Sequence, residues 1–404
     1  MTYHTVPEGW KKVPFAECID KNTKLKYGKV KKTDYLDNGD IPVIDQGQDF
    51  IAGFTDDKDM KFPGRLPVTI FGDHTLIVKY VEKEFAVGAD GTVLLYPYSQ
   101  ILTNKYFYYL VSDHKIKSEG YQRHFKYLKE KIFIIPPLSE QRKVVAILST
   151  VDGAIEKTEA IIEETKKLKK GLMQKLFTEG IGHTRIKETK IGRIPEEWDV
   201  VRFSELLEDG IISKIQDGNH GELHPKSSDF VDEGIPFIMA SNVVNGGINL
   251  KNCYFISREQ AESLRVGFSI KNDILLTHKG SVGNVAIVPE IEDFIMLTPQ
   301  VTLYRIPEEN RLLRLFLRYY FESMEFQKTL KRLSMQSTRA YIGISAQKKL
   351  WIYLPRIKEQ QQITQILSGV DTKIENELDF KKQLEQFKKG LMQVLLTGKV
   401  RVKV

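Results

Sequence analysis

Cysteine is scarce in this chain, and long apolar runs are missing. Only Cys18 and Cys253 occur among 404 residues, with no second cysteine or clustered histidine beside either, so neither a disulfide framework nor a zinc site is expected. The sequence has no run of about 18 apolar residues that would span a membrane. Residues 1–12 are polar and lack the apolar segment of a signal peptide. We therefore expect a cytoplasmic protein without membrane association.

Catalytic signatures are also missing. The sequence has no Gly-x4-Gly-Lys-Ser/Thr loop for a nucleoside triphosphate and no Gly-x-Gly-x-x-Gly after a strand. Residues 134–138 read Ile-Ile-Pro-Pro-Leu, which lacks the acid or amide and the aromatic residue of an amino-methyltransferase motif. His74 beside Asp73 has no clustered nucleophile or metal partner. These absences favour a binding protein with no catalytic residue, metal or cofactor of its own.

The strongest positive feature is an internal repeat. Residues 136–178 align with residues 355–397 without a gap at an offset of 219, and 18 of the 43 pairs are identical. Weaker anchors extend the repeat: Pro-Glu-x-Trp recurs at an offset of 188, Ile-Pro-x-Ile at 194, Val-x-Leu-Tyr at 208, and Tyr108-Tyr109 as Tyr319-Tyr320 at 211. Each half therefore consists of a variable region followed by a nearly constant one.

The two constant segments have the spacing of long helices. In the first, Ile147, Val151, Ala154, Thr158, Ile161, Thr165, Leu168 and Leu172 follow alternating steps of four and three, which is typical of a coiled-coil seam. A helix of about 40 residues would be about 60 Å long, too long to be buried in either half. We expect the two helices to pack antiparallel about a pseudo-twofold axis; packing of each helix on its own domain is the alternative. Gly171 and Gly390 suggest close helix approach, or a simple helix end.

The variable regions, 1–135 and 193–354, are predicted to mix α and β structure, with residues 180–193 as a basic linker between the first long helix and the second region. Predicted helices cover residues 104–118 and 309–333. The predicted strands are residues 66–71, 75–81, 92–96, 235–240, 273–277, 284–288 and 300–304.

Polar loop residues make both variable regions candidates for reading DNA. The net charge of +7 permits a polyanionic partner without establishing one. Gln and Asn side chains pair with adenine, Arg with guanine, and Lys, Ser or Thr with phosphates. The first region offers Gln46, Gln48, Asp73, His74, Tyr121, Gln122, Arg123 and Lys126. The second offers Ser241, Asn242, His278, Lys279, Ser281, Asn284, Gln336, Ser337, Thr338 and Arg339.

The order of these motifs resembles one family closely. A variable region, Pro-Pro-Leu-Ser-Glu-Gln-Arg leading a helix, Lys-Lys-Gly-Leu-Met-Gln-Lys-Leu, Pro-Glu-Glu-Trp, a second variable region and a second helix ending Leu-Leu-Thr-Gly-Lys-Val-Arg-Val are similar to the specificity subunit of type I restriction-modification systems. The second helix departs slightly, because it begins Pro-Arg-Ile-Lys-Glu-Gln.

The resemblance implies an α+β protein in which two α/β target recognition domains are joined by two long antiparallel helices. The implied boundaries are 1–135 for the first recognition domain, 136–182 for the central helix, 183–354 for the linker and second recognition domain, and 355–404 for the C-terminal helix. Each recognition domain would read one half of an asymmetric, bipartite double-stranded DNA target, and the helices would set the gap. Helix pairing or partner docking is expected from Ile147, Leu148, Val151, Ile155, Leu168, Leu172, Ile366, Leu367, Val370, Ile374, Phe387 and Leu391.

Catalysis, by the same resemblance, belongs to partners. Two methyltransferase subunits would dock on the helices and use S-adenosylmethionine to methylate adenine N6, and motor-nuclease subunits would use ATP and magnesium. The base to be modified must leave the duplex, so the reader would grip the flanking base pairs. Two other hypotheses stay open: a coiled-coil structural adaptor that does not read DNA, and a chain that is itself a nuclease or methyltransferase. We also expect Arg339→Ala to weaken DNA reading while assembly stays intact.

Overall fold

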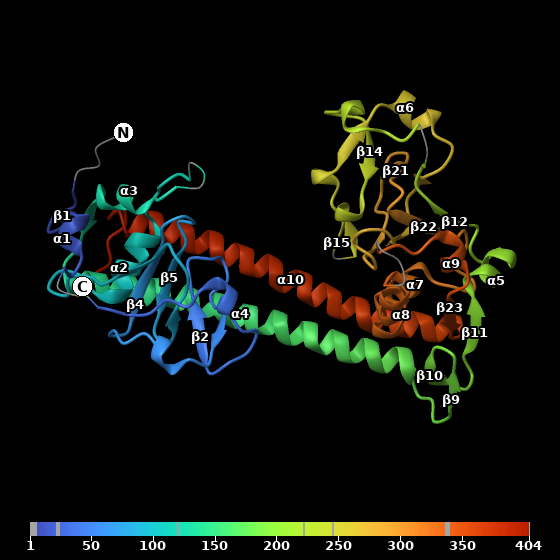
Figure 1. Ribbon diagram of the computed structural model, residues 1–404, viewed down its shortest axis with the longest axis horizontal. Coiled ribbons are helices and arrows are strands. Elements are labelled where there is room, and N and C mark those ends of the chain that lie inside the picture. Colours follow the sequence, from blue (N-terminus) through green and yellow to red (C-terminus); the bar gives the residue numbers. More distant parts are fainter. Residues whose placement is uncertain are drawn as a thin grey trace. The chain divides into compact units, whose positions relative to one another are not determined.

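The computed structural model describes residues 6–21, 25–118, 120, 122–220, 223–244, 246–335 and 340–403. Its internal contacts divide the chain into unit 1, Met1–Ala160 with Glu377–Val404, and unit 2, Ile161–Asn376. Both dividing points fall inside long helices, α4 (Leu138–Thr178) and α10 (Ile357–Leu395). Each unit therefore contains a globular domain and a part of both helices (Figure 1).

Both helices extend through their glycines. Neither segment contains proline, and α4 begins directly after Pro136-Pro137, so the backbone hydrogen-bond ladder is not interrupted. A Cβ atom added to Gly171 or Gly390 would meet no described heavy atom within 4 Å outside the helix itself. The expectations of close helix approach and of a helix end at these glycines are therefore wrong.

In each unit the helix segments run antiparallel. In unit 1, Lys388 Nζ lies 2.6 Å from Asp152 Oδ1 and Lys381 Nζ lies 2.8 Å from Glu159 Oε1, so positions on α10 fall as those on α4 rise. In unit 2, Lys169 Nζ lies 2.7 Å from Asp371 Oδ1. The two numbers in each of these three pairs add to 540, which defines one antiparallel register.

The buried seam differs from the predicted one. Leu148, Val151, Thr158 and Leu367 are buried, as are Val144, Ile162 and Ile363. Ile147, Ile161, Leu168, Ile366, Phe380 and Phe387 are exposed. The remaining predicted positions are half-buried: Ala154, Ile155, Thr165, Leu172, Val370, Ile374 and Leu391. The prediction missed the seam by one residue along part of each helix. At Ile147, Ile161 and Ile366 the next residue is the buried one and is also apolar, so the pattern does not separate the two. Leu168, Phe380 and Phe387 instead precede half-buried lysines.

Unit 1 encloses its core between small sheets and the helix pair. Phe107, Phe133 and Leu148 share one apolar cluster with Met392 and Leu395 of α10. The strands are β1 (Lys11–Pro14) paired with β8 (Ile132–Ile135), the sheet β3-β2-β6 (Gly53–Thr55, Ile41–Ile44, Ala86–Val87) and the sheet β5-β4-β7 (Val78–Val81, Val68–Gly72, Thr92–Leu95). The short helices are α1 (Phe15–Cys18), α2 (Asn104–Ser112) and α3 (Phe125–Lys129), with 3-10 turns at Lys32–Asp34 and Lys58–Met60.

Unit 2 repeats this plan and adds to it. Its strands form the pair β11 (Asp199–Arg202) with β23 (Trp351–Leu354), the sheet β12-β22-β19-β20 (Lys214–Asp217, Val301–Arg305, Ile274–Thr277, Val285–Ile287), the sheet β13-β17-β14-β21-β18 (Phe230–Val231, Tyr254–Ile256, Ile235–Ile238, Ile295–Leu297, Phe268–Ser269) and the pair β15 (Val243–Val244) with β16 (Gly247–Ile248). Its shorter helices are α5 (Phe203–Glu208), α6 (Arg258–Ser263), α7 (Arg314–Glu322), α8 (Met324–Ser334) and α9 (Ile344–Lys348), with 3-10 turns at Ser227–Asp229, Ala240–Asn242 and Leu250–Asn252.

The seven predicted strands are confirmed with small shifts of their ends. The predicted linker instead folds as a hairpin of β9 (Ile186–Thr189) and β10 (Gly192–Pro195), with Ile194 buried. The predicted helix 309–333 is two helices, because Ser323 is extended (ψ 147°) and its hydroxyl caps α8 by accepting a hydrogen bond from Phe326 N–H. No helix formed by the described residues is both long and apolar enough to cross a lipid bilayer.

Candidate DNA interface and its supports

In unit 1 the loop after β2 and the turn after β4 are tied together by Gln46. Its Oε1 accepts the His74 N–H at 3.0 Å, and its Nε2 donates to Asp90 O at 2.8 Å. Thr75 Oγ1 donates to Gln46 O at 2.6 Å. Both polar atoms of the half-buried Gln46 amide are therefore hydrogen-bonded to these loops, as is usual for polar groups that are shielded from water.

Four predicted residues meet at the end of β4. The buried Asp73 carboxylate accepts the Phe125 N–H at 2.7 Å, and its second oxygen lies 3.9 Å from Arg123 Nε. His74 Nδ1 lies 3.2 Å from Gln122 O. Arg123 and Lys126 have exposed side chains. The Asp73 carboxylate thus holds the segment at the start of α3. The side chains of Arg123 and Lys126 in this segment are exposed to solvent.

Gln48 is exposed and lines a different feature, a groove of about 730 Å³. Phe50, Tyr80 and Tyr108 line the same groove, together with Lys388 of α10. Among the described residues, Gln48 forms no hydrogen bond with the cluster around Asp73.

In unit 2 the turn between β19 and β20 presents three of the predicted residues. Lys279, Ser281 and Asn284 have exposed side chains on this turn, and Ser241 is exposed in the loop after β14. The turn is pinned at one side because Ile342 N–H donates to His278 O at 3.0 Å and Gly280 N–H donates to Ala340 O at 3.2 Å.

Two predicted residues of unit 2 are internal. His278 is buried, its Nδ1 lies 3.0 Å from Ile342 O, and burial lowers its pKa, so the ring is neutral at physiological pH. Asn242 is buried, accepts the Met239 N–H and donates to Asn252 O. Both side chains support loops in this structure, and neither presents its polar edge at the surface. Tyr121, Gln336, Ser337, Thr338 and Arg339 lie outside the described residues.

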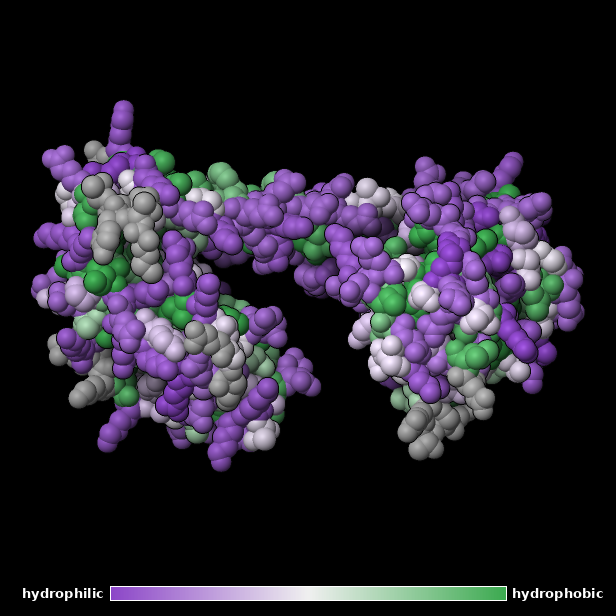
Figure 2. Space-filling view, turned by 90° about the horizontal axis from the view of Figure 1, so that it is seen from above, coloured by the Kyte–Doolittle hydropathy of each residue, from purple (hydrophilic) through white to green (hydrophobic). Residues whose placement is uncertain are grey.

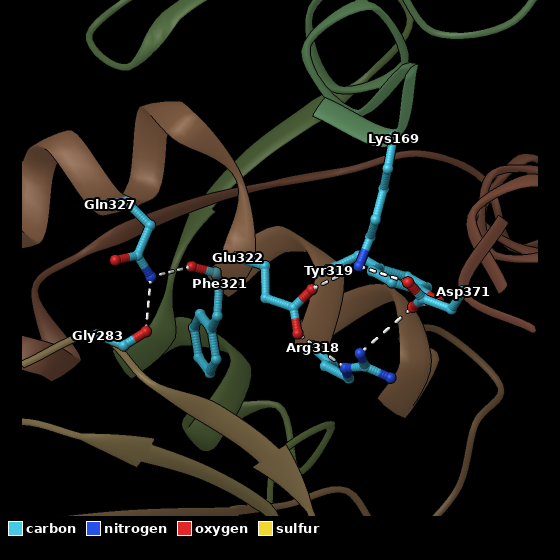
Figure 3. Close-up of polar contacts among 8 residues, drawn as sticks. All are labelled: Lys169, Gly283, Arg318, Tyr319, Phe321, Glu322, Gln327 and Asp371. Atoms are coloured by element: carbon cyan, nitrogen blue, oxygen red, sulfur yellow. Dashed lines mark hydrogen bonds and ion pairs between the residues drawn. The ribbon is translucent and has the colours of Figure 1, made fainter. Parts of the chain in front are cut away.

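Each globular domain is fastened to the helix pair by a tyrosine that points at an Asp–Lys ion pair. In unit 1 the Tyr109 hydroxyl of α2 donates to Asp152 Oδ2 at 2.5 Å, and Lys388 binds the other oxygen. In unit 2 the Tyr319 hydroxyl of α7 donates to Asp371 Oδ2 at 2.8 Å, and Lys169 binds the other oxygen (Figure 3). Burial raises the pKa of both tyrosines, so each hydroxyl remains a donor.

The tyrosine pairing corrects the sequence alignment. Tyr109 and Tyr319 occupy equivalent places at an offset of 210, so the predicted offset of 211 is wrong by one residue. Asp152 and Asp371, like Lys169 and Lys388, are identical pairs at offset 219. The sequence analysis did not predict a role for these residues, although charged residues that are identical in both copies of a helical repeat would have indicated one.

A family model described as the type I restriction modification DNA specificity domain matches residues 7–167 and, separately, residues 195–386. The chain belongs to this family. The type I restriction enzyme MjaVIII specificity subunit of Methanocaldococcus jannaschii is 30% identical over 317 residues, which cover 76% of this chain and 72% of that protein. The EcoBI specificity subunit of Escherichia coli is 26% identical over 248 residues, which cover 58% and 50%.

Solved structures of the same family share the fold. The type I restriction-modification system S subunit from M. genitalium has a TM-score of 0.55 at 16% identity and covers 96% of each chain. A structure from work on complex assembly and conformational transition of the type I system has a TM-score of 0.56 at 14% identity, covering 98% of this chain and 100% of that one.

In both halves of the chain a tryptophan binds the glutamate at the start of a long helix. In the first, Trp10 Nε1 donates to Glu140 Oε2 at 3.1 Å and Arg401 Nη2 donates to the same oxygen at 2.8 Å. In the second, Trp198 Nε1 donates to Glu359 Oε2 at 2.9 Å, and His183 Nε2 lies 3.0 Å from that oxygen. The recurring Pro-Glu-x-Trp motif is therefore explained by a tryptophan that binds the recurring glutamate.

The adjacent recurring glutamine closes the same joint. Gln141 donates to Ile101 O and Pro136 O and accepts the Thr103 N–H; Gln360 makes the equivalent bonds with Arg311 O, Pro355 O and Leu313 N–H. Both glutamines are fully buried. A buried amide that donates both hydrogens and accepts at its oxygen fixes one geometry, because each lost bond leaves an unsatisfied polar group.

The helices also carry exposed apolar side chains that repeat between the copies. Ile147 and Ile366, Ile161 and Phe380, and Leu168 and Phe387 form pairs at offset 219, all in one heptad register. Exposed fractions reach 56% for Leu168 and 57% for Phe387. Figure 2 shows hydrophobic patches within an otherwise hydrophilic surface of the long helices. Among the described residues, no group of three or more His, Cys, Asp and Glu side chains is placed to hold a metal ion.

Proposed function

We propose that the chain is the DNA-reading subunit of a type I restriction-modification complex, with each specificity domain reading one half of an asymmetric, bipartite target. One observation carries the proposal. Two domains of the same plan present different polar side chains around the end of the equivalent central strand, Arg123 and Lys126 in one and Lys279, Ser281 and Asn284 in the other. Two domains with the same scaffold but different DNA-facing side chains would bind two different half-site sequences.

The helix pair would serve as the spacer and docking surface for two methyltransferase subunits. Each exposed apolar residue directly precedes a buried or half-buried position, as Ile147 precedes Leu148 and Phe380 precedes Lys381. One residue turns the helix by about 100°, so these side chains extend the apolar seam sideways onto the open flank. In each unit both helices contribute: Ile147, Phe380 and Phe387 in unit 1, and Ile366, Ile161 and Leu168 in unit 2.

A partner helix is the occupant that fits this flank. Apolar residues in heptad spacing beside an antiparallel pair match the knobs of further helices. Because the set occurs once in each copy of the repeat, two equivalent partners would bind, one to each unit.

Catalysis is assigned to the partners. Specificity subunits are the non-catalytic components of type I systems, and we extend this to the present chain. The methyltransferase subunits would use S-adenosylmethionine, and motor-nuclease subunits would use ATP and magnesium. The purified chain, supplied alone with these compounds, should neither methylate nor cleave DNA.

Methylome sequencing tests the proposal. Cells that express the chain together with its methyltransferase should methylate adenine in a two-part motif whose halves differ and whose gap is constant. Exchange of one specificity domain for that of a relative should change one half only. A continuous or palindromic motif would contradict two independent readers. A complex that retards DNA without any sequence preference would support the structural adaptor instead.

A further inference from the structure

We infer that Gln327 and His114 are positioning residues that hold the DNA-reading turn of each specificity domain from behind. Neither side chain would touch DNA; each would fix the backbone from which other side chains read it. The inference rests on the proposed function and extends it from the reading groups to the groups that aim them. Each residue lies shortly after the helix, α7 or α2, that is fastened to the long helices.

Gln327 joins the reading turn of unit 2 to the end of α7. Its Nε2 donates to Gly283 O at 2.8 Å and to Phe321 O at 2.6 Å (Figure 3). Both donor hydrogens of the amide are therefore used, one on the turn between β19 and β20 and one on α7. The main chain of Gln327 is itself fixed, because its N–H donates to Ser323 O at 3.0 Å in the first turn of α8.

Gly283 is shaped to this contact. A Cβ atom at this position would lie 2.4 Å from Gln327 Oε1, so no other residue type fits without displacing the glutamine. Its φ of 101° lies in the region that L side chains rarely adopt. Gln327 therefore packs directly against the backbone of Gly283, and the contact requires glycine at this position.

The opposite side of the same turn is pinned by backbone bonds. Gly280 N–H donates to Ala340 O, and Ile342 N–H donates to His278 O. With Gln327 on one side and this segment on the other, the turn can move only if one anchor is released. Lys279 and Ser281 lie between the anchored residues His278 and Gly283, and Asn284 directly follows Gly283. In this proposal the direction of these three side chains is set by the backbone anchors and by Gln327 rather than by the reading groups themselves.

His114 does the same in unit 1. Ile116 N–H donates to its Nδ1 at 2.9 Å, so Nδ1 is the acceptor and Nε2 carries the hydrogen. That Nε2–H donates to Leu76 O at 3.1 Å, in the turn between β4 and β5. This turn begins with Asp73, whose carboxylate holds the segment of Arg123 and Lys126 by accepting the Phe125 N–H, and it carries His74. Leu76 has a φ of 64°, a conformation that costs energy for leucine and is kept only when its surroundings hold it. The ring also packs edge-on against Phe71 at 5.9 Å.

Binding of the complete complex to three duplexes tests the inference. The probes carry the parental target, a base change in the first half-site, and a base change in the second half-site. The variants are Gln327→Met, which keeps the length and removes both donors, and His114→Ala. The control is Lys328→Met, at the exposed next residue on α8, whose side chain pairs with Glu325. It should leave discrimination between the probes unchanged, since any lost attraction to phosphates would weaken binding to all three alike.

Gln327→Met should lower discrimination at one half-site about tenfold, which corresponds to about 1.4 kcal/mol, and leave the other half unchanged. His114→Ala should relax the opposite half, and His114→Gln, which restores a donor, should recover most of the discrimination. The unaffected half reports in every case that the protein is folded.

Equal losses at both halves, or parental discrimination at both, would overturn the inference. If Gln327→Met fails to fold, the comparison of His114→Ala with His114→Gln decides. Failure of the proposed function looks different, because then the parent complex itself distinguishes none of the probes.

Discussion

Lys388 Nζ lies 2.6 Å from Asp152 Oδ1 in unit 1. The repeat-related residues form the same ion pair in unit 2, where Lys169 Nζ lies 2.7 Å from Asp371 Oδ1. Adding 219 to Asp152 and Lys169 gives Asp371 and Lys388, so the same two residue types form the bond in both units with the helices exchanged. The two units therefore contain the same ion pair, with the roles of α4 and α10 exchanged. A tyrosine from each globular domain completes the pair.

We predict that the Asp152–Lys388 pair contributes more to stability than a typical surface ion pair. The side chains are 17% and 21% exposed, and Asp152 also accepts the Tyr109 hydroxyl. A double-mutant cycle with Asp152→Ala and Lys388→Ala should give a coupling of about 1 to 2 kcal/mol in thermal unfolding. The more exposed Glu159–Lys381 pair on the same helices is the control and should give about 0 to 1 kcal/mol. Equal couplings would contradict the assignment.

Replacing the helix glycines should stabilise the protein. Gly171 and Gly390 lie in helix interiors, and no described heavy atom beyond the helix backbone would meet a Cβ within 4 Å. Gly171→Ala and Gly390→Ala should each raise the free energy of unfolding by about 0.5 to 1 kcal/mol, because alanine loses less conformational entropy in a helix. Urea denaturation of the isolated chain measures this change. A loss of stability would mean that something packs against these sites in the free protein.

Neighbouring residues on α4 should give opposite results. Leu148 is fully buried, so Leu148→Glu would bury an unpaired charge and should destabilise the isolated chain by more than about 3 kcal/mol. Leu367→Glu should behave alike in unit 2. Ile147 is 38% exposed, so Ile147→Glu should change stability by less than about 0.5 kcal/mol.

Ile147→Glu should instead weaken methyltransferase binding, measured by analytical ultracentrifugation or calorimetry of the mixed subunits. Ile366→Glu, the repeat-related change, should weaken binding of the second methyltransferase and leave the first in place. If the variant with both Ile147→Glu and Ile366→Glu binds the methyltransferase subunits fully, the exposed apolar residues are not the docking surface.

Stability should fall in mild acid. Burial lowers the pKa of His114 and of His278 from the usual 6.5. Between the folded and unfolded pKa values the unfolded chain binds more protons, so the stabilisation is present above pH 6.5 and is lost as the pH falls toward the folded values. Melting temperatures measured from pH 8 to pH 5 should show this loss. The variant His114→Gln should show a shallower pH dependence, and an unchanged slope would contradict the role of His114.

Lys279→Ala should weaken binding to every sequence rather than change the motif. Its side chain is exposed on the reading turn, and a lysine that contacts a phosphate contributes about one unit to the slope of log affinity against log salt. Titration of the complex with DNA at several salt concentrations measures that slope. Asn284→Ala, on the same turn, should change discrimination at one base position and leave the slope unchanged.

The sequence alone determined the repeated plan, the positions of seven strands and the family. The 219-residue offset can be seen without a structure, and strand patterns such as residues 274–276 are continuous apolar runs near turn residues. These signals are local, so they persist without knowledge of what packs against them. The family resemblance was confirmed for the same reason, because it depended on the long constant segments.

Tertiary structure alone decided which helix face is buried and which polar residues face outward. Ile147 and Leu148 are both apolar, and only the antiparallel register buries one and exposes the other. His278 and Asn242 have the same composition signal as Lys279 and Asn284, yet their polar atoms satisfy loop backbones. Burial and hydrogen-bond partners come from residues far away in the chain, and no periodicity encodes them. Gln327 and His114 were overlooked for that reason, since their function depends on turns that lie 44 and 38 residues away.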